Sequence, residues 1–491
     1  MRRSELWLYL TLLLGCGLTA CSDKETAGSA GAPFNANAPI SITDFYPDSG
    51  GIATPMIISG TNFGTDTTGL KVFFIDENNV RHRGGLVSTN GEKIYCYVPS
   101  GLTYMRKIGL QVERTVQGKT EPVVGTCDRP FYYKTQTAVT TVVGQVSTTE
   151  QPTKAATLST TTLSAPLYIC LDDEDNIFIV ERRLGAARPQ AITCKKSDGS
   201  NSKGNVLRAS LTKDEVVMLS EDQFNLPNAP AFSDEPGMEA VYVPSDEGMG
   251  FMQLSKSTDY QPRALLALKN DKFPEIDKNN WKFSFVVNKV DKQIYTVMHG
   301  GQLVRIDPRT RRTEVLLKKV GIHGYQDGGT DSYFAFSPIE PNKLFVCQSD
   351  NNEIWTVDID QLEGKDIDNY HGESYAGRGC YEGLSAGRGW EDGLLKNAKF
   401  YYPRQICFTK DGKLYIADSG NSCIRSIDTT LPPDKATVTT VVGIPGSHGH
   451  QDGGPDIAKF RYPYGVAVSA DGSIVYVADT GNRVIRKLSI E

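Results

Sequence analysis

The chain has 491 residues, with 52 lysines and arginines against 58 aspartates and glutamates, so its formal net charge is −6. This mild acidity, without a basic run, argues against nucleic acid as a partner and gives no reason to expect adsorption to anionic lipid. The length supports more than one domain. We therefore expect a multidomain protein whose partners are neither nucleic acids nor charged membrane surfaces.

The first segment, residues 1–20, has the features of a targeting peptide. Two arginines precede an apolar run at residues 6–14 that is too short to span a bilayer. The run leads to Leu-Thr-Ala-Cys at residues 18–21, which resembles the lipobox of bacterial lipoproteins. The resemblance implies cleavage before Cys21 and acylation of that cysteine. The alternative is an ordinary secretory signal peptide.

Residues 21–37 are predicted to form a flexible tether, since alanine, glycine and asparagine dominate them. The tract Ser-Asp-Lys-Glu at residues 22–25 resembles the surface-export signal of some Gram-negative lipoproteins, although a solvated linker has the same composition. We expect a lipid-anchored protein of the outer membrane, exposed at the cell surface. Its membrane contact would be through the lipid alone.

Residues 38–134 are predicted to form a separate β-sandwich, because short alternating strands are separated by turn residues. The stretch at residues 47–51 has the form Pro-x-x-Gly-Gly, and residues 58–64 read Ile-Ser-Gly-Thr-Asn-Phe-Gly. Both resemble the IPT/TIG domain, an immunoglobulin-like module that usually acts as a spacer or contact module. Cys96 and Cys127 are a possible disulfide pair, because an oxidising compartment permits such a bond.

A long internal repeat dominates the C-terminal part, where residues 398–425 and 458–486 are near copies. Each copy contains an Asp-Gly turn between two apolar strands, an Asp-x-Gly-Asn turn and a third strand with Ile-Arg. Asp-Gly between apolar strands predicts a hairpin with positive φ at both turn residues. With a fourth strand, each unit has the four antiparallel strands of one propeller blade.

The last copy lacks a fourth strand of its own. The sequence Val-Thr-Thr-Val-Val-Gly at residues 438–443, the fourth strand of the preceding copy, recurs unchanged at residues 139–144. We expect residues 139–144 to close the ring by pairing with the C-terminal strands, since closure removes exposed sheet edges.

Four weaker copies of the hairpin bring the count to six blades, and residues 135–491 then form the whole propeller. They are at 166–180, 232–243, 283–298 and 333–346. The repeat resembles the NHL repeat, most closely in the last two copies. The fold class predicted from the sequence is therefore all-β, an immunoglobulin-like sandwich followed by a six-bladed β-propeller.

Aromatic and histidine side chains gather in, or just after, the loops that enter the last three blades. If those loops converge around the central channel, their rings are suited to stacking on sugar rings, with polar neighbours for the hydroxyls. Tyr402 and Tyr462 are interpreted instead as packing residues of the repeat. The predicted ligand-binding residues are Trp390, Tyr325, His323, His448, His450, Arg404 and Tyr464.

The sequence has no His-Glu-x-x-His helix and no phosphate loop. His448, His450 and Asp452 alternate along one loop and were weighed as zinc ligands, but Asp452 belongs to an Asp-Gly-Gly motif that recurs at Asp327 without paired histidines. We therefore predict no metal, no cofactor and no catalytic residue, and leave enzymatic activity undecided.

The combined features predict a cell-surface glycan-binding lipoprotein that passes oligosaccharide or polysaccharide to an outer-membrane transporter. This rests on resemblance to surface lipoproteins with IPT/TIG and NHL regions in polysaccharide-uptake systems, which is a weak basis for function. Two alternatives remain: a lyase or hydrolase with a site in the central channel, and a protein-interaction scaffold.

Overall fold

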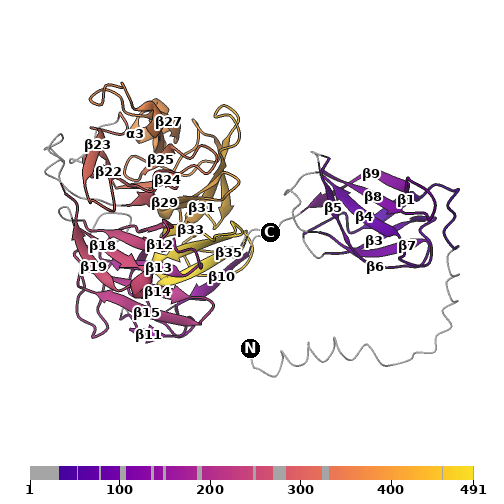
Figure 1. The fold of residues 1–491 in the computed structure, drawn as a ribbon, viewed down its shortest axis with the longest axis horizontal. Coiled ribbons are helices and arrows are strands. Elements are labelled where there is room, and N and C mark those ends of the chain that lie inside the picture. The colour runs from indigo at the N-terminus through magenta and orange to yellow at the C-terminus, as the bar shows by residue number, and fades with distance from the viewer. Residues whose placement is uncertain are drawn as a thin grey trace. The chain divides into compact units, whose positions relative to one another are not determined.

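The computed structural model describes most of the chain beyond residue 31 (Figure 1). The described ranges are 32–51, 54–76, 79–99, 107–133, 138–146, 151–184, 191–246, 250–268, 284–322, 331–455 and 457–489. The targeting peptide and Cys21 lie outside them. Within these ranges no helix has the length and apolarity that a bilayer crossing needs. The chain divides into two compact units, residues 1–135 and 136–490.

The first unit has two sheets with a shared apolar core. One sheet has the order β1 (Ser41–Tyr46), β3 (Pro55–Thr61), β7 (Lys93–Tyr97), β6 (Gly85–Thr89), and the other has β2 (Ser49–Gly50), β9 (Val123–Tyr133), β8 (Lys107–Arg114), β4 (Leu70–Ile75), β5 (Arg81–Arg83). Alternate residues of β4 and β8 are buried in the core, as one solvated face and one packed face require. Cys96 and Cys127 are both free thiols, so the possible disulfide is not formed in this structure.

The described strands of the second unit form six sheets. Each sheet is named after the first strand of its hairpin: β12, β16, β20, β24, β29 or β33. Strands β10, β11 and β28 come earlier in the chain than that hairpin and do not give their sheets a name. The sheets are β12 (Pro166–Leu171), β13 (Ile177–Arg182), β14 (Gly204–Ser210), β15 (Glu215–Glu221), β11 (Ala155–Ala156); β16 (Ala231–Ser233), β17 (Ala240–Pro244), β18 (Gly250–Ser255), β19 (Pro262–Leu266); β20 (Val286–Val287), β21 (Ile294–Val297), β22 (Leu303–Ile306), β23 (Thr313–Leu317); β24 (Ser332–Phe336), β25 (Lys343–Gln348), β26 (Glu353–Asp358), β27 (Glu373–Ala376); β29 (Pro403–Phe408), β30 (Lys413–Asp418), β31 (Cys423–Asp428), β32 (Thr437–Val442), β28 (Gly393–Leu394); and β33 (Pro463–Val468), β34 (Ile474–Asp479), β35 (Val484–Ser489), β10 (Ala138–Val143).

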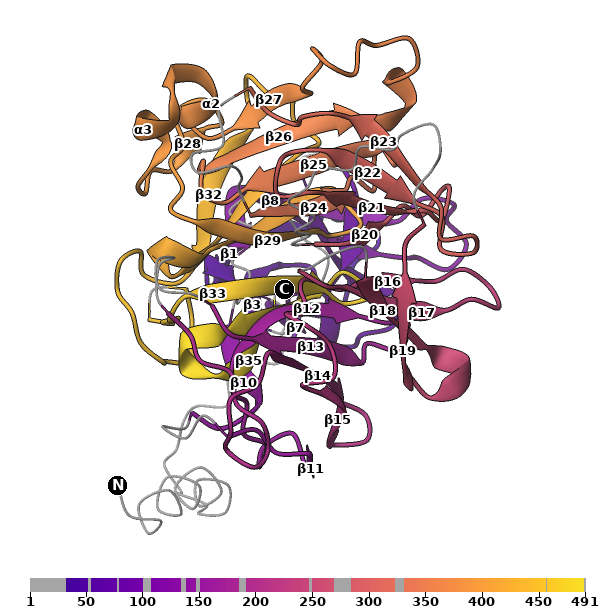
Figure 2. The same ribbon diagram turned by 90° about the vertical axis from the view of Figure 1, so that its left-hand side faces the viewer.

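The first strands of neighbouring sheets touch one another in a propeller-like arrangement (Figure 2). Contacts run from β12 to β16, β20, β24, β29 and β33 and then return to β12. All four of the weaker sequence copies contain the predicted antiparallel hairpin, which pairs β12 with β13, β16 with β17, β20 with β21 and β24 with β25. The first strands therefore surround a common centre.

Strand β10 lies in the same sheet as the last three strands of the chain. It pairs antiparallel with β35, so that Val139 faces Leu488 and Thr141 faces Arg486. Val139 also exchanges two backbone hydrogen bonds with Gly453, at 2.8 and 2.9 Å. A strand more than 300 residues away in the sequence thus supplies the outer strand that the last repeat lacks.

The repeated Asp-x-Gly-Asn and Ile-Arg residues form one buried network in each of the last two sheets. In the β29 sheet, Asp418 accepts hydrogen bonds from Arg425 Nη1 at 2.8 Å, Asn421 Nδ2 at 2.8 Å and the Tyr401 amide at 2.9 Å. Arg425 and Asp418 are both fully buried. In the β33 sheet, Asp479 and Arg486 form the equivalent pair at 2.8 Å. The repeated motif therefore contributes to the fold of each sheet.

The Asp-Gly hairpins differ in detail from the sequence-based expectation. Gly412 and Gly472 have φ values of 87° and 83°, whereas Asp411 and Asp471 are not in the positive-φ region. The Gly412 amide donates to Thr409 O at 3.0 Å, so the aspartate occupies an ordinary turn position and glycine alone supplies the left-handed residue. This is the pattern of a longer hairpin loop with a glycine bulge.

A buried carboxyl group in the β12 sheet should make stability depend on pH. Burial raises the pKa of Glu181 from about 4.5 to about 7, although Asn205 and the amides of Ser164 and Ala165 oppose the shift. Between these values the folded state holds the proton that the unfolded state has lost, so stability falls as pH rises. We expect Glu181→Gln to reduce this decline by on the order of 2–3 kcal/mol in urea titrations from pH 4 to pH 8.

The exposed Glu363 provides the control for this prediction. Glu363→Gln should leave the pH dependence as it is in the parent protein. If the Glu181→Gln and parent curves stay parallel over the whole range, the raised pKa is refuted.

Candidate functional site

The loops before β29 and β33 fasten the outer strand of their own sheets. Asp392 accepts hydrogen bonds from the Thr440 amide at 3.0 Å and its hydroxyl at 3.1 Å, and Asp452 contacts the Thr141 amide and hydroxyl at 3.0 and 3.2 Å. The same carboxylates bind Arg425 and Arg486. Asp392 therefore joins the buried Arg425 to β32, and Asp452 joins the buried Arg486 to β10. We call this arrangement the clamp.

Trp390 and His450 occupy equivalent positions in these two loops. The Trp390 indole Nε1 donates to Thr440 Oγ1 at 3.0 Å, and His450 Nε2 shares a 2.9 Å hydrogen bond with Thr141 Oγ1. Both rings therefore lie beside the fourth strands of their sheets, β32 and β10, and not around the channel as the loops were expected to place them. Trp390 keeps 50% of its surface exposed, so its ring is held in place while remaining accessible.

His448 lies against the packing tyrosine of the β33 repeat. Its ring centroid is 4.7 Å from that of Tyr462, and Nδ1 shares a 2.6 Å hydrogen bond with Ser422 Oγ. Burial, with a smaller contribution from Arg461, lowers the pKa of His448. The imidazole is thus a neutral, stacked ring at neutral pH, with hydrogen-bonding capacity but no charge.

A second aromatic pair lies directly before β29, as Tyr462 lies directly before β33. Tyr401 and Tyr402 lie with centroids 5.1 Å apart, and Arg388 covers the Tyr401 ring at 4.6 Å while donating to its hydroxyl at 2.7 Å. We call the exposed and partly buried rings of the loops that precede β29 and β33 the loop-face aromatic patch. It consists of Trp390, Tyr401, Tyr402, His448 and Tyr462.

The patch includes residues that were not predicted as ligand-binding. Tyr402 and Tyr462 were interpreted as packing residues, and both do hold a repeat-specific backbone with φ of 48° and 50°. Their amides bond Asn352 Oδ1 at 2.8 Å and Ser422 Oγ at 3.2 Å. Arg388 was missed, although its place in the loop matches that of His448 in the repeat.

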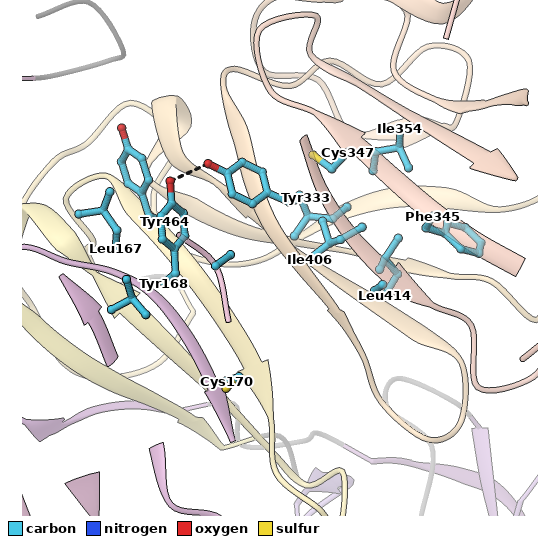
Figure 3. Close-up of a cluster of buried hydrophobic side chains, with 14 of the residues drawn as sticks. Leu167, Tyr168, Cys170, Tyr333, Phe345, Cys347, Ile354, Ile406, Leu414 and Tyr464 are labelled. Atoms are coloured by element: carbon cyan, nitrogen blue, oxygen red, sulfur yellow. Dashed lines mark hydrogen bonds between the residues drawn. The ribbon is translucent and has the colours of Figure 1, made fainter. Parts of the chain in front are cut away.

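Arg404 and Tyr464 lie elsewhere, inside the second unit. Figure 3 shows Tyr464 among the buried side chains, with Tyr168 and Tyr333. The Arg404 guanidinium is 4.8 Å from the Tyr464 centroid and forms a 2.6 Å ion pair with Asp331. Tyr168 and Tyr333 join the cluster through a 2.8 Å hydrogen bond between their hydroxyls. Arg404 and Tyr464 are 1% and 0% exposed, so they bind the first strands together and do not reach solvent.

Two predicted residues, His323 and Tyr325, fall in residues 323–330, outside the described part of the chain. The weighed zinc set is dispersed: His448 bonds Ser422, His450 bonds Thr141, and Asp452 holds Arg486. Among the residues that are described, no group of three or more His, Cys, Asp or Glu side chains is arranged to hold a metal ion.

Comparison with family models identifies two modules. Residues 39–124 match the IPT/TIG domain, and residues 400–425 match the NHL repeat. A curated relative is human NHL repeat-containing protein 2, which is 31% identical over 101 residues, covering 20% of this chain and 13% of that protein. The matched stretch is a small part of the human protein.

Solved structures with a similar fold come from Bacteroides. An auxiliary nutrient binding protein from Bacteroides ovatus has a TM-score of 0.57 at 18% identity, covering 94% of this chain and 100% of that one. One with the same description from Bacteroides thetaiotaomicron has a TM-score of 0.55 at 19% identity over 94% and 99%. A putative phosphatase from the latter species has a TM-score of 0.57 at 17% identity over 94% and 98%. At these identities the similarity concerns the fold alone.

Proposed function

We propose that this protein captures oligosaccharide or polysaccharide at the loop-face aromatic patch without cleaving it. The observation that carries the proposal is the exposed Trp390 ring, which its hydrogen bond to Thr440 holds in place. Fixed aromatic faces stack on the apolar faces of sugar rings at little cost in conformational entropy. Arg388 and the neutral His448 supply polar groups for the hydroxyls.

The wider proposal places this face outside the cell. Cys21 would carry the lipid anchor in the outer membrane, the tether and the IPT/TIG domain would extend the chain, and a transporter would receive the glycan. The second unit would be a six-bladed propeller whose ring is closed by residues 139–144, as the cyclic order of the first strands and the β10–β35 pairing favour. Fold similarity to two nutrient binding proteins supports a binding role.

The test is affinity electrophoresis and calorimetry against a panel of polysaccharides, with product analysis of each mixture. We expect retention on at least one glycan, unchanged chain length of that glycan, and a loss of about tenfold in affinity for Trp390→Ala, since a stacked ring contributes about 0.5–1.5 kcal/mol beyond its buried area. Tyr97→Ala in the first unit, where the ring is also exposed, should bind as the parent does.

Each other outcome removes part of the proposal. Shortened glycan would show a propeller enzyme, either lyase or hydrolase. Absence of retention on any glycan would refute capture and favour a scaffold for protein partners. Retention that Trp390→Ala does not weaken would place the glycan somewhere other than the loop-face aromatic patch.

A further inference from the structure

A cavity of about 460 Å³ lies at the centre of the second unit, at the C-terminal ends of the first strands. All six first strands contribute to it, and it is partly open to solvent. Tyr402 and Tyr462 of the loop-face aromatic patch directly precede β29 and β33, so they lie at the opposite end of those strands. This volume falls within the range of about 300–1,000 Å³ that is typical of small-molecule sites.

The walls of this cavity are largely apolar. Five phenylalanines from four of the first strands and their flanking residues contribute, namely Phe232, Phe285, Phe334, Phe336 and Phe408. Gln405 also lines it, but its side-chain amide is already bonded to the backbone of Ile169 at 2.7 and 3.2 Å. Burial raises the pKa of the lining thiols Cys170 and Cys407, so they remain neutral. The interior therefore suits a hydrophobic body.

Two lysines are the charged residues among the described residues that line the cavity. Lys289 follows β20, Lys410 follows β29, and both are exposed. Neither forms an ion pair with a described carboxylate, although Lys289 contributes at longer range to the lowered pKa of Asp234. Two other lysines at this end of the sheets are paired, Lys256 with Asp173 at 2.7 Å and Lys292 with Asp234 at 2.8 Å.

We propose that this cavity binds a small amphipathic organic anion, with its apolar body against the phenylalanines and its carboxylate, sulfonate or phosphate between Lys289 and Lys410. Charge complementarity favours an anion over a neutral or cationic ligand, because two lysines that form no ion pair with a described carboxylate lie beside an apolar site. Such a ligand would occupy a site distinct from the proposed glycan site. The proposal of an anion site does not depend on the proposal of glycan capture.

The test compares two fluorescent probes that share a ring system, the anion 1-anilinonaphthalene-8-sulfonate and the uncharged 1-anilinonaphthalene. We expect the sulfonate to bind the purified protein saturably at one site. The double variant Lys289→Gln/Lys410→Gln should weaken the sulfonate about tenfold, as two partly exposed charge contacts allow, and leave the uncharged probe unchanged. Lys396→Gln/Lys435→Gln, at exposed positions away from the cavity, is the matched control.

A second variant locates the probes independently of charge. Val468 lines the cavity and is half-buried, so Val468→Trp should fill part of it and weaken both probes, with circular dichroism confirming the fold. Unchanged binding of both probes to Val468→Trp would overturn the proposal, as would equal losses of the two probes in the lysine variant. Glycan retention should persist in all of these variants, which separates this site from the loop-face aromatic patch.

Discussion

Replacing Val139 with aspartate is expected to destabilise the second unit by more than about 4 kcal/mol, because a charge would be buried without a partner. Val139 is fully buried and packs in a cluster that includes Ile424 and Val442 of the β29 sheet and Leu488 of β35. It belongs to the only strand that joins the start of the unit to its end within the described residues. The urea unfolding midpoint measures the loss.

The adjacent residue supplies the control for this prediction. Thr140 lies on the same strand but is exposed, so Thr140→Asp should change stability by less than about 0.5 kcal/mol. If Val139→Asp fails to fold, Val139→Ala should still cost about 2 kcal/mol through the cavity it leaves. Equal, small effects of the Val139 and Thr140 substitutions would show that residues 138–143 do not seal the ring in solution.

Much of the fold could be predicted from the sequence, because the residues that recur in the repeat are those whose hydrogen bonds hold each sheet together. Asp418, Asn421 and Arg425 recur as Asp479, Asn482 and Arg486, and each set bonds within its own sheet. The same reasoning found β10, since identical strand sequences face equivalent partners, Thr440 with Asp392 and Thr141 with Asp452.

The candidate site was less predictable, because position in a repeat does not show how far a residue lies from the central axis. Arg404 and Tyr464 follow the entry proline of β29 and β33 directly, and there they are buried between first strands. Trp390 lies only 14 positions earlier in the chain but at the outer strand. The central cavity could not be predicted from the sequence, because its lining comes in short apolar runs from six separate strands.

The second large effect is expected from Arg425→Met, which should destabilise the protein by about 3–5 kcal/mol. Methionine can fill the space of the arginine stem but leaves the fully buried Asp418 carboxylate without its cation. It also removes the donors to the Lys399 and Glu391 carbonyls at 3.1 and 2.8 Å. Urea unfolding of the variant against the parent protein measures the loss.

The exposed Arg388 is the matched control, and Arg388→Met should change stability by less than about 1 kcal/mol. Adding Asp418→Asn to Arg425→Met should recover part of the loss, because the substitution removes the unpaired charge. If the double variant is no more stable than the single one, the loss comes from the carbonyls and from packing, and not from the carboxylate.

The same substitution in the next sheet tests the clamp as well as the ion pair. Arg486 pairs with Asp479 as Arg425 does with Asp418. Arg486 also holds Asp452, which bonds Thr141 of β10, just as Arg425 holds Asp392, which bonds Thr440 of β32. The equivalent strand in the β29 sheet, β32, follows directly in the chain after β31, whereas β10 is held by tertiary contacts alone. Arg486→Met should therefore accelerate hydrogen exchange in β10 selectively, while Arg425→Met leaves β10 protected.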